Sequence, residues 1–158
     1  MKKGSTLFLK VVILLIAVGA LFALLWFPPS EGRAAGLDLV SIYLDPVIMY
    51  MYIASVAFFA GLYQAFTLLN LIDRNKAFSQ EAVNKLRNIK LASLILAGFV
   101  IAGIIYLRLF AHGDDPAGPT MLGAFMSLAF GVIATAAGVF QKLLQNAVDI
   151  KSENDLTV

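Results

Sequence analysis

Four long stretches without a charged side chain dominate this 158-residue sequence. They cover residues 11–27, 46–72, 91–107 and 116–141. An α-helix rises about 1.5 Å per residue, so roughly 20 residues cross the ~30 Å hydrocarbon core of a bilayer. Charged residues make up only 14% of the chain, against about 25% in an average soluble domain. The sequence therefore predicts an all-α membrane protein whose four transmembrane helices pack as an antiparallel bundle.

The first and third uncharged stretches are shorter than a typical span. Lys10 before the first and Arg108 after the third can extend them, because long basic side chains reach along a helix toward water. We expect a single domain, with spans at about 7–27, 46–72, 90–110 and 119–144. An alternative interpretation of the first stretch is a secretory signal peptide, but the run is long and no small-residue cleavage motif follows it.

The distribution of lysine and arginine predicts the orientation. With both termini in the cytoplasm, ten of the twelve basic residues lie inside and only Arg33 and Arg108 lie outside. Basic residues accumulate on the cytoplasmic side of membrane proteins. We therefore predict a multi-pass protein with cytoplasmic termini. We attribute the basic pI to this topology, and we expect no direct binding of nucleic acid.

Prolines mark two predicted helix boundaries. Pro28 and Pro29 should stop the first helix, because proline lacks the amide donor that a helix needs, whereas Pro46 suits the first turn of the second. The cytoplasmic parts are then the loop 73–90 and the tail 145–158. In the loop, Ser79 is a predicted N-cap, and apolar residues at helical spacing predict a short amphipathic helix that leads into the third span.

The chemistry available to the chain is narrow. It contains no cysteine, which excludes thiolate nucleophiles and cysteine-based metal sites. Every charged side chain lies at or near the end of a span, whereas charged groups deep within a membrane by default mark ion pathways and intramembrane active sites. His112 lies beside Asp114 and Asp115 on a short loop that lacks the fixed geometry of a metal site. We expect no catalysis, no cofactor and no metal.

Small and polar residues inside the spans predict how the helices pack. Small residues four apart share one helix face and permit close approach of backbones. The predicted packing residues are Ala57, Gly61, Ala65, Gly123, Ser127, Gly131 and Thr135. A homodimer seam through the fourth span is the alternative use of this row. Gln64, Thr67 and Asn70, with Ser93, Thr135 and Gln141 at similar depth, predict a layer of interhelical hydrogen bonds.

Two polar motifs carry a resemblance to a known family. AFSQEAVNKLRNIK precedes the third span and SENDLTV ends the chain. Both resemble the bacterial integral-membrane family known as domain of unknown function 2975. The resemblance implies a four-span protein of the bacterial cytoplasmic (inner) membrane without established activity. Genes of this family often neighbour one for a small Cro-like helix-turn-helix protein, which implies a regulatory or sensory role toward such a transcription regulator.

These observations favour a noncatalytic membrane protein that binds a cytoplasmic regulator through the loop and the tail. The candidate partner-binding residues are Phe78, Ser79, Glu81, Lys85, Leu86, Arg87, Lys90, Glu153, Asn154 and Asp155. The alternative is a small transporter, channel subunit or lipid-binding membrane protein. It would use the polar layer and an outer pocket lined by Tyr50, Tyr52 and Tyr106.

Overall fold

The structure is a computed structural model that describes residues 3–30, 36–110 and 117–157. The described part is helical, contains no strand, and includes four helices long and apolar enough to cross a membrane. The expectation of an all-α protein with four candidate spans is thus confirmed. The helices are α1 (Lys3–Ser30), α2 (Leu39–Tyr43), α3 (Pro46–Asp73), α4 (Gln80–Phe110) and α5 (Ala117–Leu156).

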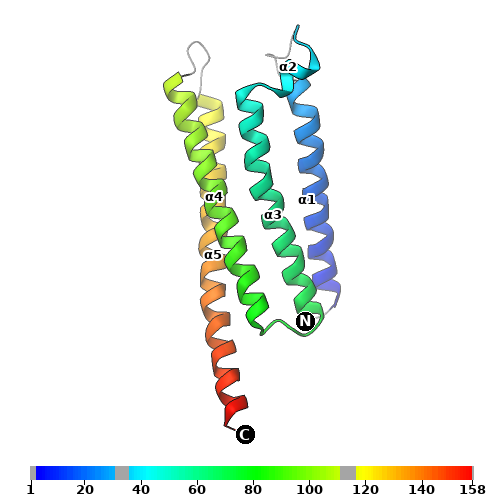
Figure 1. Cartoon of the computed structure of the whole chain (residues 1–158), viewed down its shortest axis with the longest axis vertical. Coiled ribbons are helices and arrows are strands. Elements are labelled where there is room, and N and C mark those ends of the chain that lie inside the picture. Colours follow the sequence, from blue (N-terminus) through cyan, green and yellow to red (C-terminus); the bar gives the residue numbers. More distant parts are fainter. Residues whose placement is uncertain (1–2, 31–35, 111–116, 158) are drawn as a thin grey trace.

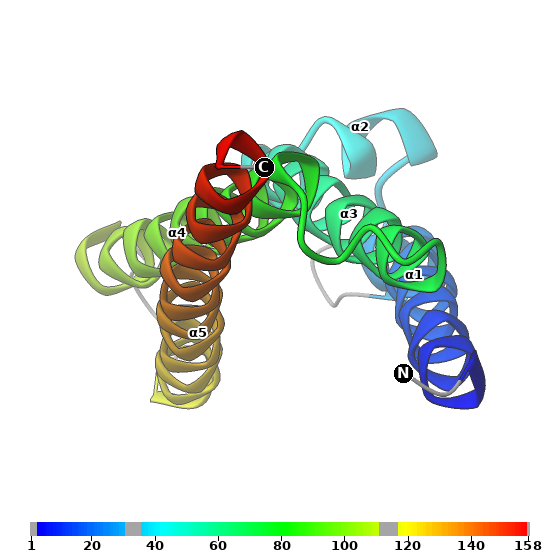
Figure 2. The same cartoon turned by 90° about the horizontal axis from the view of Figure 1, so that it is seen from below.

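The four long helices form an open, curved row. The neighbours are α1 with α3, α3 with α4, and α4 with α5, and no other pair of long helices shares more than a marginal contact among the described residues. Figure 2 shows α1 and α5 at the two ends of the row. The sequence predicted an antiparallel bundle without saying whether it closes, and the structure arranges the long helices as an open row. Closure is not required in a bilayer, because lipid tails solvate an apolar helix face as well as another helix does.

Both termini lie at one end of the molecule, together with the connection 74–79 between α3 and α4 (Figure 1). We call this end the terminal end. The short helix α2 lies at the opposite end. The last turns of α5 extend beyond the α3–α4 connection in Figure 1, because a 40-residue helix is about 60 Å long, twice the thickness of the hydrocarbon core.

The first helix passes through the two prolines that were expected to stop it. In an α-helix the amide of residue i donates to the carbonyl of residue i−4, so Pro28 and Pro29 leave the Leu24 and Leu25 carbonyls without donors. Tyr52 on α3 donates its hydroxyl to the Leu24 carbonyl at 2.7 Å. Tyr43 on α2 donates to the Leu25 carbonyl at 3.3 Å. The prediction of a stop at Pro28 was wrong because hydroxyls from distant residues replace the missing amides.

The two predicted helix starts, at Pro46 and after Ser79, are confirmed. α3 begins at Pro46, and the carboxylate of Asp45 accepts a hydrogen bond from the amide of Val47 at 2.8 Å. Before α4, the hydroxyl of Ser79 accepts from the amide of Ala82 at 3.2 Å. α4 then continues without interruption to Phe110. Side chains thus satisfy orphan amides at both starts.

The pairing of α4 with α5 follows a heptad pattern. The residues of α5 that are buried or half-buried at alternating steps of four and three are Gly123, Ser127, Phe130, Ala134, Ala137, Gln141, Leu144 and Val148. A repeat of 3.5 residues keeps one seam facing its partner along the whole helix. A row with steps of four drifts away from that seam, and Thr135 is accordingly exposed. The predicted row and the observed seam share Gly123 and Ser127.

Candidate functional site

The carboxylate of Asp73, at the end of α3, joins α3 to α1. Its Oδ2 forms an ion pair with the ammonium of Lys10. Its Oδ1 lies 2.5 Å from the hydroxyl of Thr6, whose side chain is buried. The Lys10 ammonium also lies 5.8 Å from the centre of the Phe66 ring. Because both carboxylate oxygens are occupied and the charge is paired, this cluster fixes the helices and offers no free base.

A reciprocal amide pair joins the start of α4 to α5. The Gln80 amide nitrogen donates to Gln145 Oε1 at 3.1 Å, and the Gln145 nitrogen donates back to Gln80 Oε1 at 3.2 Å. The second amide hydrogen of Gln145 is directed to Asp149 Oδ1 at 2.8 Å. Since an amide carries two donors, one Gln145 side chain serves both contacts. This pair joins the first residue of α4 to α5, and the last turns of α5 extend past it.

The candidate partner-binding residues all lie at the terminal end, in two separate groups. In the α4 group Phe78, Glu81 and Arg87 are exposed, and Ser79, Lys85, Leu86 and Lys90 are half-buried. Glu153, Asn154 and Asp155 are exposed on the last turns of α5. Among the described residues, no hydrogen bond or ion pair joins the second group to the first. Each group therefore includes exposed polar side chains, Glu81 and Arg87 in the first and Glu153, Asn154 and Asp155 in the second.

The predicted polar layer is not connected in the described part of the chain. Thr67 bonds within its own helix, to the Tyr63 carbonyl at 2.6 Å. Thr135 donates to the Gly131 carbonyl of its own helix at 2.8 Å. Ser93 is buried and Asn70 is half-buried. Gln64 Oε1 is buried and accepts no hydrogen bond from a described residue. Among the described residues, the structure thus shows no interhelical hydrogen bond between these groups.

The predicted packing residues of α3 face α4 at one close approach. A Cβ added to Gly61 would lie 3.3 Å from the Cβ of Ala92, and Ala57 and Ala65 are half-buried one turn away on either side. On α5, a Cβ at Gly123 would lie 2.8 Å from Ile104, whereas the space around Gly131 is open. The structure therefore places only part of the α5 row against α4.

The three tyrosines expected around an outer pocket point to different helices. The Tyr50 hydroxyl donates to the Phe99 carbonyl on α4 at 2.7 Å, whereas that of Tyr52 donates to α1. The ring of Tyr106 lies 5.3 Å from that of Phe110 on its own helix. In the part of the chain described, Tyr50 and Tyr52 therefore act as links between helices. The sequence shows where these tyrosines lie along the spans, but it does not show which backbone carbonyls accept from their hydroxyls.

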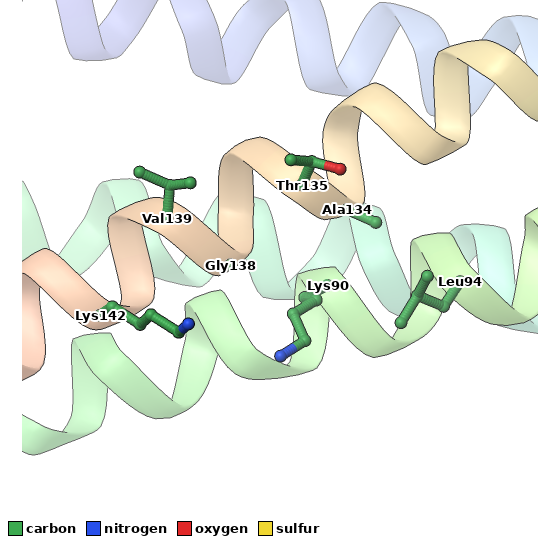
Figure 3. A pocket seen from close by; sticks show the side chains of 7 residues that line it. All are labelled: Lys90, Leu94, Ala134, Thr135, Gly138, Val139 and Lys142. Carbon is green, nitrogen blue, oxygen red and sulfur yellow. The ribbon is translucent and has the colours of Figure 1, made fainter.

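A groove between α4 and α5 is the cavity that combines apolar walls with charge. Its volume is about 320 Å³. The residues lining it are Lys90, Leu94, Ala134, Thr135, Gly138, Val139 and Lys142, and Figure 3 shows the two lysine side chains extending toward each other along it. Lys142 was not predicted from the sequence as a site residue. The available signal was its position directly after the fourth uncharged stretch, equivalent to that of Lys90 before the third.

The described residues hold no group of three or more potential metal-binding side chains. The sequence His112-Gly-Asp114-Asp115 lies outside the described residues. Asp73 is paired with Lys10, and the uncharged interiors of the four helices provide no acid or base. In the described part of the chain, the contacts found at the terminal end hold helices together.

Comparison with known proteins places these features in a family. The family model described as protein of unknown function (DUF2975) matches residues 30–158. A Bacillus subtilis (strain 168) protein described as uncharacterized membrane protein YoaS is 41% identical over 162 residues, and the alignment covers 100% of both chains. No solved structure matches the chain. The family model begins at the last residue of α1 and covers α2 to α5, whereas the relative also aligns with α1.

Proposed function

Because the chain belongs to the DUF2975 family of membrane proteins of unknown function, we propose that it is a noncatalytic membrane anchor for a cytoplasmic transcription regulator. It lies in the bacterial cytoplasmic membrane, with antiparallel spans and both termini in the cytoplasm. The Lys/Arg bias supports this orientation. The terminal end then faces the cytoplasm, where a soluble regulator can reach it.

The observation that carries the proposal is the extension of α5 past its contact with Gln80. Residues 146–156 continue as helix beyond the Gln145–Gln80 pair, and the side chain of Ile150 is 60% exposed there. Phe78, at the start of the other group, is 63% exposed. Ile150 on α5 and Phe78 in the α3–α4 connection are thus large apolar side chains that the described residues leave largely uncovered. Such anchors fit an apolar groove on a partner protein.

Charge supports the same surface. The loop 73–90 carries five basic and two acidic residues, and the tail 145–158 carries three acidic residues and one lysine. Within the described residues, the ion pair of the loop is that of Asp73 with Lys10. The other charges therefore remain available to a partner, and the acidic tail suits a basic surface such as the one a helix-turn-helix protein uses for DNA.

The test is retrieval of the regulator from native membranes by tagged full-length chain after cross-linking. We expect a helix-turn-helix protein, and we expect the double variant Phe78→Ser and Ile150→Ser to lower its recovery about tenfold or more, because apolar anchors dominate binding energy. Val40→Ser is the matched control, since Val40 is 65% exposed on α2 at the opposite end. Recovery of no such regulator, or equal losses in both variants, contradicts the proposal.

A second pair of substitutions separates the two surfaces. Replacing Lys85 and Arg87 by glutamine removes two charges of the loop, while Lys90 and the α4–α5 groove stay intact. If the regulator binds the basic loop, recovery falls and becomes less sensitive to salt. If Glu153→Gln and Asp155→Asn lower recovery instead, the acidic tail is the principal contact. Unchanged recovery in both pairs excludes a charged contact through either surface.

A further inference from the structure

At the terminal end, the charged residues that directly adjoin the uncharged stretches differ in whether they form an ion pair. Each long helix has one residue of this kind next to its uncharged stretch: Lys10, Asp73, Lys90 and Lys142. The first two neutralise each other. Lys90 and Lys142 form no ion pair with any described residue. Two positive charges at the membrane boundary therefore have no carboxylate partner within the part of the chain that the structure shows.

The α4–α5 groove brings these two charges together. Lys90 is half-buried because its aliphatic stem crosses α5 at Gly138, where an added Cβ would lie 3.2 Å from Lys90 Cδ. α4 begins at the terminal end and α5 ends there (Figure 1). Helical side chains tilt toward the start of their own helix, so the two lysine side chains extend toward each other (Figure 3).

The walls of the groove identify the rest of the ligand. Leu94, which is 50% exposed, lies beyond the ammonium groups, and Val139, which is 52% exposed, lies at the level of the Lys142 ammonium (Figure 3). Both belong to the stretches that are long and apolar enough to cross the bilayer. A ligand that fits has a negatively charged group at the membrane boundary and an apolar chain directed into the bilayer. An ammonium group binds phosphate as a point charge, and headgroups of anionic lipids attract basic residues at this level.

We propose that the groove binds one anionic phospholipid, with its phosphate between Lys90 and Lys142 and one acyl chain along Leu94 and Val139. The lipid belongs to the leaflet at the terminal end. Its phosphate offsets the repulsion between the two ammonium groups, and its acyl chain covers a surface that neither neighbouring helix reaches. This binding requires no cytoplasmic partner, so it stands or fails separately from the anchoring of a regulator.

The test presents the purified full chain with equal amounts of phosphatidylglycerol and phosphatidylcholine of the same acyl chains, and native mass spectrometry counts the retained lipids. We expect wild type to prefer phosphatidylglycerol. Each lysine replaced by glutamine should lower the preference about fivefold, because one basic residue contributes about 1 kcal/mol at an anionic surface. Lys142 is exposed, so Lys142→Gln tests the site even if substitution of Lys90 disturbs folding.

The matched control is the double variant Lys76→Gln and Lys151→Gln, which removes the same charge from exposed positions at the same end. It should keep the wild-type preference. A loss equal to that of the double variant Lys90→Gln and Lys142→Gln would reduce the effect to net charge and overturn the site. Thr135→Phe fills the groove without changing charge and should lower retention of phosphatidylglycerol. Retention unchanged by Thr135→Phe would overturn the placement of the acyl chain.

A final arm distinguishes a lipid from a free anion. Inorganic phosphate is added to the protein in phosphatidylcholine alone, and thermal unfolding is recorded. We expect no shift for phosphate and a higher midpoint when phosphatidylglycerol is added. Stabilisation by phosphate that disappears in Lys142→Gln, without a preference for phosphatidylglycerol, would assign the lysines to a soluble anion and overturn the lipid site.

Discussion

The hydroxyl of Tyr52 donates a 2.7 Å hydrogen bond to the carbonyl of Leu24, the acceptor that Pro28 deprives of its amide donor. A residue of α3 thereby completes the last turns of α1. In a bilayer an unsatisfied carbonyl costs several kcal/mol, whereas interhelical hydrogen bonds contribute about 0.6–2 kcal/mol in membranes. The tyrosine is thus part of the reason that α1 can contain its prolines.

Tyr52→Phe should destabilise the protein by about 1–2 kcal/mol, because the Leu24 carbonyl loses its donor. The same substitution should cost less in a Pro28→Ala background, where a backbone amide reaches that carbonyl. Reversible unfolding of the four proteins of this double-mutant cycle gives the coupling between the two positions. Equal costs in both backgrounds would show that the hydroxyl does not substitute for the amide.

Asp73→Asn should loosen the start of α1. Lys10 would lose its carboxylate partner, because asparagine keeps one acceptor oxygen but carries no charge. A lysine without its partner is then left beside the apolar part of the bilayer. We expect the unfolding midpoint to fall by several degrees in detergent, whereas Glu81→Gln, at an exposed position of α4, should leave it unchanged. Exchanging the charges, with Lys10→Asp and Asp73→Lys together, should recover part of the loss. Failure of this exchange would point to the hydrogen bond of Thr6 as the main contact.

Gly123 and Gly131 belong to the same predicted row but should respond differently to alanine. A Cβ at Gly123 would lie 2.8 Å from Ile104, so Gly123→Ala requires movement of that side chain, and overpacking typically costs about 1–3 kcal/mol. No atom lies within 4 Å of a Cβ at Gly131. Gly131→Ala should therefore be neutral or slightly stabilising, since alanine favours helix. Chemical unfolding compares the two variants, and equal effects would contradict the assigned seam.

Gln64→Leu should raise stability by about 1 kcal/mol. The Gln64 side-chain carbonyl is buried without a described donor, and an unmet buried polar group costs about 1–3 kcal/mol. Thr67→Val is the control, because the hydroxyl of Thr67 is satisfied within its own helix and its loss should matter less. If Gln64→Leu instead destabilises the protein, that carbonyl has a partner, and a polar site at this depth should be sought.

Local sequence patterns were sufficient for some elements. Uncharged length predicts the four candidate spans, Ser79 marks the start of α4, and Pro46 marks the start of α3. Each of these features depends on residues that are contiguous or close together in the sequence. The motif around Phe78 likewise identified the family that the comparisons show.

Features that join distant parts of the chain could not be predicted from sequence alone. Asp73 meets Lys10 across 63 positions, and Tyr52 meets Leu24 across 28. Both contacts change a local expectation, since Lys10 was expected to extend toward water and Pro28 to end a helix. The open row was also unpredictable, because residue patterns show which helix faces are apolar but do not distinguish a lipid neighbour from a helix neighbour.

The order of the long helices in the row is also their order of synthesis. α3 packs on α1, α4 packs on α3, and α5 packs on α4, so each span that enters the bilayer finds its neighbour already inserted. No helix has to wait for a later one or be displaced by it, and contacts between consecutive elements keep the closing loops short. The fold can therefore be built stepwise in the order of synthesis, with α5 added last to an existing surface.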